Sequence, residues 1–292
     1  QEGMKKYGAS EGSVVVMDPK TGGILAMAAY PSYDPQKFRV FEKSLYKNPI
    51  VASAYEPGST IKVLVMAAAI QEKLVTPAAT MEETGPVQIG EYSIRTWNDQ
   101  YHGTISMTKV LEYSSNVGMT YVAGKLGKER LLSYIRNFGF GAPTGTDVEE
   151  ESSPQLRKDS EWGPIDLATA SFGQGIAVTP IQMVRAVGAI ANDGFLMEPH
   201  MVKEIRDRRG RSVTVRPKKV IQVLRPATAN IITEMMIAAV DNGEAKWAKP
   251  KGYRIAGKTG TAQIPVAGHY DEKKTIASFV GFAPADDPKF VM

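Results

Sequence analysis

The chain has strand-forming segments at both ends and a long helix-rich stretch between them. Residues 13–30 contain two β-rich apolar runs around the turn-forming cluster Asp18–Gly23, which predicts a hairpin. Strand patterns return near the other end, at residues 253–256, directly after Lys258, at 275–282 and from Phe290 onward. This order predicts an α/β (α+β) fold with a central antiparallel sheet whose first two strands come from the N-terminal part.

The middle of the chain is expected to form a large, mostly helical insertion beside that sheet. Residues 31–57 contain four prolines and are expected to be loop-like, while helical patterns follow at residues 59–74, 104–126, 131–138, 179–192 and 227–242. The pattern at 104–126 is expected to break into two helices near Ser114–Asn116. We therefore expect one domain over residues 1–292, with a sheet subdomain at about 1–50 and 220–292 and a helical subdomain at about 51–219.

Composition excludes several classes of site. There are no cysteines, so a catalytic thiol, a thiolate metal site and disulfides are excluded. The three histidines are far apart and lack metal-ligand spacing. The formal net charge of +4 does not require a nucleic-acid partner, and the basic run Arg206–Arg211 is expected to be a solvated loop or hairpin. No apolar run is long enough to span a membrane.

A serine followed three residues later by a lysine occurs three times, at Ser44–Lys47, Ser59–Lys62 and Ser106–Lys109. On a helix this spacing places both side chains on one face, where a neutral lysine can take the serine proton. Asn48-Pro49 leaves no room for a helix after the first pair, and Ser106 is expected to be an ordinary helix cap.

The pair Ser59–Lys62 differs from the other two because it opens an apolar helix after Pro57-Gly58. A nucleophile gains from the positive end of a helix dipole, and burial against an apolar wall disfavours a charged lysine. We therefore expect this serine to be the nucleophile.

Two further motifs follow in the chain. Ser114-Ser115-Asn116 is an S-x-N tripeptide, and Lys258-Thr259-Gly260-Thr261 follows an extended segment. A strand at the second motif would present a cation and two hydroxyls on one edge, which suits a carboxylate, and its glycine lets a ligand approach the backbone. A second K-T-G, at Lys20–Gly22, lies in the predicted hairpin turn and is expected to be only a turn.

The order S-x-x-K, S-x-N, K-T-G resembles that of penicillin-binding proteins. Longer strings resemble the transpeptidase domain of class B members, the cell-division and cell-elongation peptidoglycan synthases, with the septal and sporulation-type group favoured. These strings are GSVVVMDPKTGGILAMAAYPSYDP, AYEPGSTIK, EYSSNVGM, SFGQGIAVTPIQM and GKTGTAQ, and together they span nearly the whole chain. The resemblance implies the penicillin-binding-protein and serine β-lactamase-like fold.

The resemblance also implies a role for each motif residue. Ser59 would attack a D-alanyl-D-alanine stem peptide and form an acyl-enzyme, with Lys62 as general base. Ser114 would relay a proton to the leaving amine, and Asn116 would bind the substrate amide and orient Lys62. Lys258 would lower the pKa of Lys62 and attract the substrate carboxylate, which Thr259 and Thr261 would bind. Gly260 would let the substrate approach the backbone closely. The backbone N–H groups of Ser59 and Thr261 would form the oxyanion hole.

The biological setting follows from the same resemblance. The expected function is D,D-transpeptidation of peptidoglycan stem peptides, inhibited by β-lactams, in cell-wall synthesis and division. The expected partners are stem peptides, β-lactams, a membrane glycosyltransferase and division or elongation proteins, with no nucleic acid, no metal and no organic cofactor. The expected location is the extracytoplasmic face of the bacterial cytoplasmic membrane, anchored by an N-terminal segment outside this chain. Both ends are expected to be cuts in a longer protein, which would truncate the domain at its C-terminus.

Other functions remain alternatives at this point. A β-lactam sensor, or a non-catalytic scaffold of the division machinery, would keep the fold without crosslinking peptides. A serine β-lactamase would need a deacylating group, and Glu149–Glu151 lie in a comparable interval but lack the E-x-x-L-N pattern. A D,D-carboxypeptidase differs only in using water as the acceptor.

Overall fold

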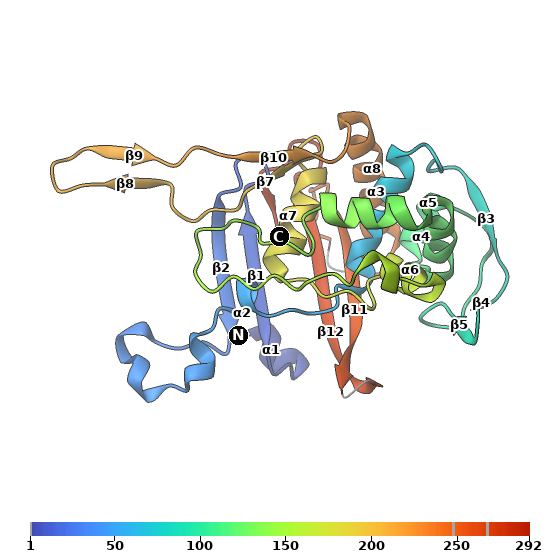
Figure 1. Cartoon of the computed structure of the whole chain (residues 1–292), viewed down its shortest axis with the longest axis horizontal. Coiled ribbons are helices and arrows are strands. Elements are labelled where there is room, and N and C mark those ends of the chain that lie inside the picture. The colour runs from blue at the N-terminus through green and yellow to red at the C-terminus, as the bar shows by residue number, and fades with distance from the viewer. Residues whose placement is uncertain (1, 247–248, 267–268) are drawn as a thin grey trace.

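The computed structural model describes residues 2–246, 249–266 and 269–292. Its central sheet has five strands in the order β11-β12-β13-β1-β2, and each neighbouring pair is antiparallel. The strands are β1 (Gly12–Met17), β2 (Ile24–Tyr30), β11 (Ala256–Val266), β12 (His269–Ala283) and β13 (Phe290–Val291). The predicted antiparallel sheet, with its first two strands from the N-terminal part, is confirmed (Figure 1).

The strand that contains Lys258 begins later than predicted. It starts at Ala256, whereas the sequence pattern placed extended structure from Tyr253. The backbone of Arg254 is engaged elsewhere, because its carbonyl accepts a hydrogen bond from the N–H of Ala285 in the segment after β12. The side chain of Arg254 also forms an ion pair with Asp286 in that segment.

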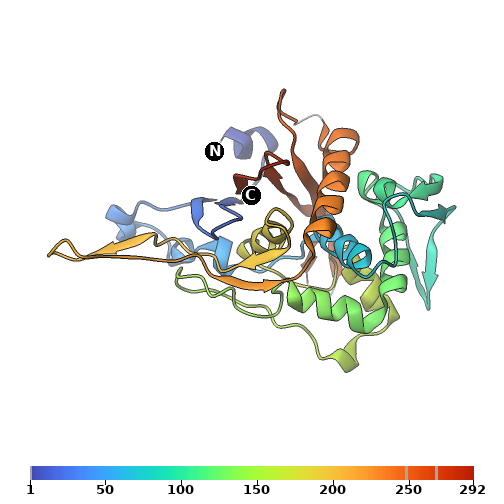
Figure 2. The same ribbon diagram turned by 90° about the horizontal axis from the view of Figure 1, so that it is seen from above.

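Eight α-helices and four 3₁₀ helices are present in the described ranges. The α-helices are α1 (Glu2–Tyr7), α2 (Pro49–Ala52), α3 (Lys62–Gln71), α4 (Met107–Glu112), α5 (Asn116–Asn137), α6 (Pro164–Ser171), α7 (Pro180–Ile190) and α8 (Pro226–Asn242). The 3₁₀ helices are η1 (Pro35–Val40), η2 (Lys43–Tyr46), η3 (Gly58–Ile61) and η4 (Asp159–Glu161). Helix α7 packs against β1, β12 and β13, and α8 packs against β11 (Figures 1 and 2). None of the described helices combines the length and the apolar character needed to cross a membrane.

Helix α3 is buried along almost its whole length. Its residues from Lys62 to Ile70 are all buried, between α5, α8 and α7. A helix that is apolar on every side has no solvent face and belongs in the centre of a domain. The predicted helix over 59–74 is therefore confirmed, with a 3₁₀ turn at its start and its last helical residue at Gln71.

The predicted break near Ser114–Asn116 separates α4 from α5. Ser114 has a positive φ of 55°, so the chain leaves the first helix there. The hydroxyl of Ser115 then accepts a hydrogen bond of 2.8 Å from the N–H of Gly118 and caps α5. Helix α5 continues through the non-helical Gly127 to Asn137, so it includes most of the helix predicted separately at 131–138.

Four small antiparallel strand pairs of the described residues lie outside the central sheet, and three of them were not predicted. They are β3 (Thr80–Glu83) with β6 (Gly103–Ser106), β4 (Val87–Ile89) with β5 (Tyr92–Ile94), β7 (Phe195–Met197) with β10 (Lys219–Gln222), and β8 (Glu204–Arg206) with β9 (Ser212–Thr214). The β8–β9 pair confirms the hairpin expected around the basic run. It projects from the end of the molecule opposite to β3–β5 (Figures 1 and 2).

Candidate active site

The three sequence motifs converge where η3, the α4–α5 turn and β11 meet. The Nζ atom of Lys62 donates hydrogen bonds to the backbone oxygen of Ser114 at 2.5 Å and to Oδ1 of Asn116 at 2.8 Å. The Ser114 hydroxyl lies 3.3 Å from the same Nζ atom. Strand β11 packs directly on η3. A lysine so placed can exchange a proton with groups on the S-x-N turn.

The nucleophile candidate Ser59 lies in the 3₁₀ turn that leads into α3, and its side chain is half-buried. Two glycines shape this turn. Gly58 has φ of +54°, and its N–H donates to the oxygen of Gly173 at 3.1 Å. A Cβ atom on Gly173 would come within 2.1 Å of the Gly58 oxygen, so only glycine fits at this backbone crossing. The crossing fixes the backbone immediately before the serine.

Gly260 makes the corresponding close approach from β11. A Cβ atom there would lie 2.9 Å from the side chain of Thr60 and 3.2 Å from the backbone oxygen of Pro57. The glycine of the K-T-G motif therefore lets the strand lie against the turn that holds Ser59.

Burial strongly changes the electrostatics of Lys62. The side chain is completely buried, and this loss of hydration, together with the charge of Lys258, lowers its pKa well below the ordinary value. The carboxylates of Glu244 and Glu83 act in the opposite direction. A lowered pKa makes the neutral amine accessible, as a general base requires.

Lys258 is also almost entirely buried, at 3% exposure. Burial lowers its pKa to about 8, opposed by the charge of Glu244. Its Nζ atom donates to the backbone oxygen of Thr259 at 3.1 Å and lies 3.4 Å from the hydroxyl of that residue. The Thr259 hydroxyl donates to Oε2 of Glu244 at 3.0 Å, while Thr261 is exposed. This edge of the sheet therefore offers a cation and hydroxyls, and one of the hydroxyls already binds a carboxylate.

The copies at Ser106–Lys109 and Lys20–Gly22 have the local roles expected of them. The expectation of no helix at Ser44–Lys47 is wrong, because η2 covers Lys43–Tyr46 and Asn48 caps α2 at Pro49. The hydroxyl of Ser106 caps α4 by accepting a hydrogen bond from the N–H of Lys109. Lys109 forms an ion pair with Glu112. The Lys20–Gly22 segment lies in the β1–β2 turn, where Gly22 has φ of +82°.

Four residues of this region were missed by the sequence analysis: Glu83, Ser115, Gly173 and Glu244. Ser115 and Gly173 stood inside quoted strings without a role. Glu83 is completely buried on β3, and the hydroxyl of Ser115 donates a hydrogen bond to its Oε1. No local sequence signal could identify Glu83 or Glu244, because their contacts join segments that are distant in the chain.

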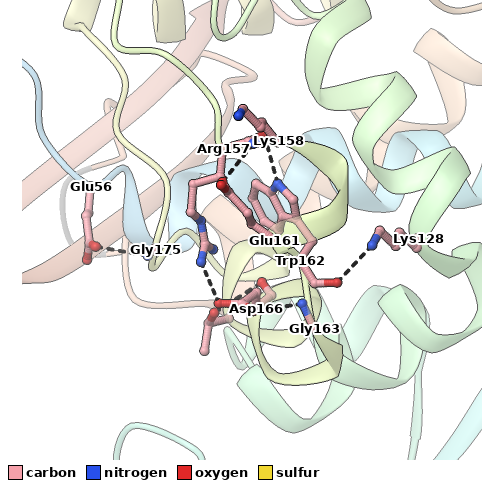
Figure 3. Close-up of polar contacts among 10 residues, drawn as sticks. Glu56, Lys128, Arg157, Lys158, Glu161, Trp162, Gly163, Asp166 and Gly175 are labelled. Carbon is pink, nitrogen blue, oxygen red and sulfur yellow. Dashed lines mark hydrogen bonds and ion pairs between the residues drawn. The ribbon is translucent and has the colours of Figure 1, made fainter.

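A groove of about 490 Å³ lies beside the nucleophile turn. Its wall includes Tyr55, Arg157, Trp162, Ile176, Ile264 and Ile276. Figure 3 shows how this wall is held. The Arg157 guanidinium lies 4.6 Å from the Trp162 ring and pairs with Asp166 at 2.9 Å, while Glu56 accepts a hydrogen bond of 2.9 Å from the N–H of Gly175. The groove connects residues 54–56, which precede the nucleophile turn, with the part of β11 after the K-T-G motif and with Ile276 of β12.

No cluster of three or more metal-ligating side chains occurs within the described residues.

Comparison with known proteins decides the family. Residues 12–292 match the model of the penicillin binding protein transpeptidase domain. The chain belongs to this family. The resemblance to class B penicillin-binding proteins is thereby confirmed, as is the fold.

Individual relatives agree with this penicillin-binding-protein assignment. The chain is 38% identical to stage V sporulation protein D of Bacillus subtilis, over 98% of this chain and 45% of that protein. It is 32% identical to the peptidoglycan D,D-transpeptidase FtsI homolog of Mesostigma viride, over 100% of this chain and 53% of that protein. The transpeptidase-family chain thus spans about half the length of the curated relatives it matches.

A solved structure matches over the whole chain. Penicillin binding protein 3 of Mycobacterium tuberculosis, complexed with aztreonam, superposes with a TM-score of 0.93 at 34% sequence identity. The match covers 100% of this chain and 67% of that structure. The penicillin-binding-protein fold therefore extends over all the segments that bring the three motifs together.

Proposed function

We propose that the chain is the catalytic domain of a peptidoglycan D,D-transpeptidase that works through an acyl-enzyme on Ser59. The observation that most supports this is the environment of Lys62. The lysine lies one helical turn after Ser59, is completely buried, and has a lowered pKa. Its Nζ atom is hydrogen-bonded to Ser114 and Asn116. An ordinary structural lysine has no need of this arrangement.

The proposed reaction has two acyl-transfer steps. In the first, Lys62 takes the proton of the Ser59 hydroxyl as its oxygen attacks the penultimate D-alanine carbonyl of a stem peptide. The backbone N–H groups of Ser59 and Thr261 stabilise the oxyanion. Ser114 passes the proton to the leaving nitrogen, and D-alanine departs. In the second step, an amine of another stem peptide attacks the ester and releases the serine with a new peptide bond.

The other motif residues bind and orient. Asn116 holds Lys62 and faces the substrate amide. Lys258, Thr259 and Thr261 receive the terminal carboxylate, and Gly260 allows close approach to the strand. A β-lactam presents a similar acyl group and carboxylate, so it acylates Ser59 and leaves slowly.

The alternatives have less support. Glu151 accepts hydrogen bonds from the N–H groups of Thr144 and Gly145, and Glu149 and Glu150 are exposed, so this loop offers no poised base for rapid deacylation. A non-catalytic scaffold has no need of a depressed lysine pKa, whereas a sensor is acylated through the same base and is distinguished only by the second assay below. We also propose that the domain acts at the extracytoplasmic face of the bacterial cytoplasmic membrane, anchored by an N-terminal segment outside this chain, with a glycosyltransferase and division or elongation proteins as partners; membership of the penicillin-binding-protein family supports this.

Intact-protein mass after incubation with benzylpenicillin tests the nucleophile. We expect a stable adduct on the parent chain and on the matched control Ser106→Ala, and none on Ser59→Ala. An adduct on Ser59→Ala would overturn the assignment.

A second assay then separates the reactions. Purified stem peptides ending in D-alanyl-D-alanine should give crosslinked dimers and free D-alanine. Stable acylation without any dimer would favour a sensor, and rapid turnover of a chromogenic cephalosporin would favour a β-lactamase.

A further inference from the structure

Glu83 is a buried carboxylate that the proposed mechanism does not use. It lies at the end of β3, directly opposite Gly103 of β6. Met81 and Glu83 are the buried residues of this strand, while Thr80 and Glu82 point to solvent. The alternation of a strand therefore places a charged group where an apolar one would ordinarily stand. Removing a carboxylate from water is costly unless it has compensating interactions.

The compensating contact leads directly to the proposed active site. The hydroxyl of Ser115 donates to Oε1 of Glu83 and at the same time accepts from the N–H of Gly118. Ser115 is the middle residue of the S-x-N motif. The residues on either side of it, Ser114 and Asn116, are those that hold the Nζ atom of Lys62.

The turn held in this way is not a relaxed one. Ser114 has φ of 55°, a conformation that serine rarely adopts. Such a conformation persists only when surrounding contacts fix it. Backbone bonds at the end of α4 hold part of this turn, because the N–H groups of Ser114 and Ser115 donate to the oxygens of Leu111 and Val110. The side-chain contacts are the helix cap of Ser115, its bond to Glu83 and the bonds to Lys62. The side chains of Ser115, Glu83 and Lys62 are almost completely buried.

We propose that Glu83 is a positioning residue of the transpeptidase site, whose carboxylate anchors the Ser114–Asn116 turn through the Ser115 hydroxyl and so holds the turn against Lys62. This inference rests on the proposed function. Glu83 touches neither the substrate nor the reacting atoms in this mechanism. It acts by fixing the position of the two residues that orient the general base.

The second oxygen of Glu83 supports a functional reason for the carboxylate. Its Oε2 atom is buried and has no hydrogen-bond partner among the described residues. A half-satisfied buried carboxylate weakens a fold compared with an apolar residue of the same shape. Stability alone therefore does not account for a glutamate at this position.

The charge of Glu83 also reaches the general base. Lys62 is faced by Lys258 from β11, by Glu244 from the segment after α8, and by Glu83 from β3. The negative charge of Glu83 raises the pKa of Lys62 and so partly opposes the effects of burial and of Lys258. Loss of that charge should extend the neutral form of Lys62 to lower pH.

Two variants separate the hydrogen bond from the charge. Glu83→Gln keeps the shape and an oxygen that can accept from Ser115, but it removes the charge. Glu83→Ala removes both. Glu82→Gln is the matched control, because it removes a carboxylate one residue away on the exposed face of the same strand.

The assay is stopped-flow acylation by a fluorescent penicillin over a range of pH, which yields the acylation rate constant and the non-covalent dissociation constant separately. We expect Glu83→Ala to lose at least tenfold in the rate constant, with the dissociation constant changed less than twofold. Glu83→Gln should recover most of the rate, and the acid limb of its pH profile should move to lower pH. Glu82→Gln should match the parent in rate and profile.

The controls keep the outcomes distinct. Circular dichroism establishes that each variant is folded at the assay temperature. If the parent is not acylated on Ser59, the proposed function fails and the inference fails with it. If the parent is acylated normally but Glu83→Gln has an unmoved acid limb and folded Glu83→Ala keeps the parent rate, only the inference is overturned. Should Glu83→Ala not fold, Ser115→Ala takes its place in the same assay, because it removes the hydroxyl that joins Glu83 to the turn; an unchanged rate constant would then overturn the inference.

Discussion

Replacing Lys258 by methionine should make the domain more stable while abolishing its acylation. The lysine is almost entirely buried and its pKa is about 8, compared with the ordinary value of 10.5. At about 1.36 kcal/mol for each tenfold change in a protonation equilibrium, this difference corresponds to about 3 kcal/mol. Methionine has a similar length and no charge to bury. We therefore expect Lys258→Met to raise the free energy of unfolding at pH 7 by up to about 3 kcal/mol.

The pH dependence provides the sharper test. Between pH 8 and 10.5 the unfolded parent binds more protons at this lysine than the folded parent, so the stability of the parent rises with pH in that window. The variant lacks this contribution. The advantage of Lys258→Met should therefore be greatest below pH 8 and should vanish near pH 10.5.

Urea unfolding of both proteins at pH 7 and pH 10.5 measures the effect, and intact mass after benzylpenicillin measures acylation. Lys203→Met, on the exposed β8–β9 arm, is the control and should change stability by no more than about 0.5 kcal/mol at either pH. A variant less stable than the parent at pH 7, or a difference that does not shrink towards pH 10.5, would refute the reasoning.

Three further substitutions test other contacts. Gly173→Ala should lower acylation at least tenfold, measured by adduct formation over time, because its Cβ atom would push against Gly58; unchanged kinetics would show that the crossing is not needed. Glu244→Ala should speed acylation, because it removes the acceptor that engages the Thr259 hydroxyl; slower acylation by a fluorescent penicillin would contradict this competition. Ser106→Ala should lower the free energy of unfolding in urea by about 1 kcal/mol, because it removes the cap of α4, and should leave acylation unchanged. Slower adduct formation would mean that the S-x-x-K copy at Ser106–Lys109 contributes to the reaction.

The local structure at each motif could be predicted from the sequence, whereas most of the long-range contacts around the motifs could not. The placement of Ser59 one turn before Lys62 at the start of a helix could be predicted from their spacing, and the break at Ser114–Asn116 from the interrupted apolar pattern. We inferred that these segments meet the strand after Gly257 from the order of the three motifs and from their resemblance to those of penicillin-binding proteins. The structure supplies the packing that places them together.

The missed features depend on long-range packing or on very short elements. Strands β3 to β10 have only three or four residues each, too few for a periodic pattern to be recognised. The burial of Glu83 depends on the fold around β3, and Glu244 reaches Thr259 only because α8 packs on β11. The late start of β11 likewise depends on the contact between Arg254 and Ala285.

The arrangement of the sheet also has a consequence for how the chain folds. Strand β1 lies between β2 and β13, and β13 lies between β1 and β12, so residues near 15 must find partners near 290. Contacts between residues so far apart in sequence form late, because closing the long loop between them costs conformational entropy before the contacts can stabilise the fold. During synthesis the nucleophile helix leaves the ribosome long before the strand bearing Lys258. The reactive serine therefore cannot acquire its full set of partners until almost the entire domain has been made, which couples the appearance of reactivity to the completion of folding.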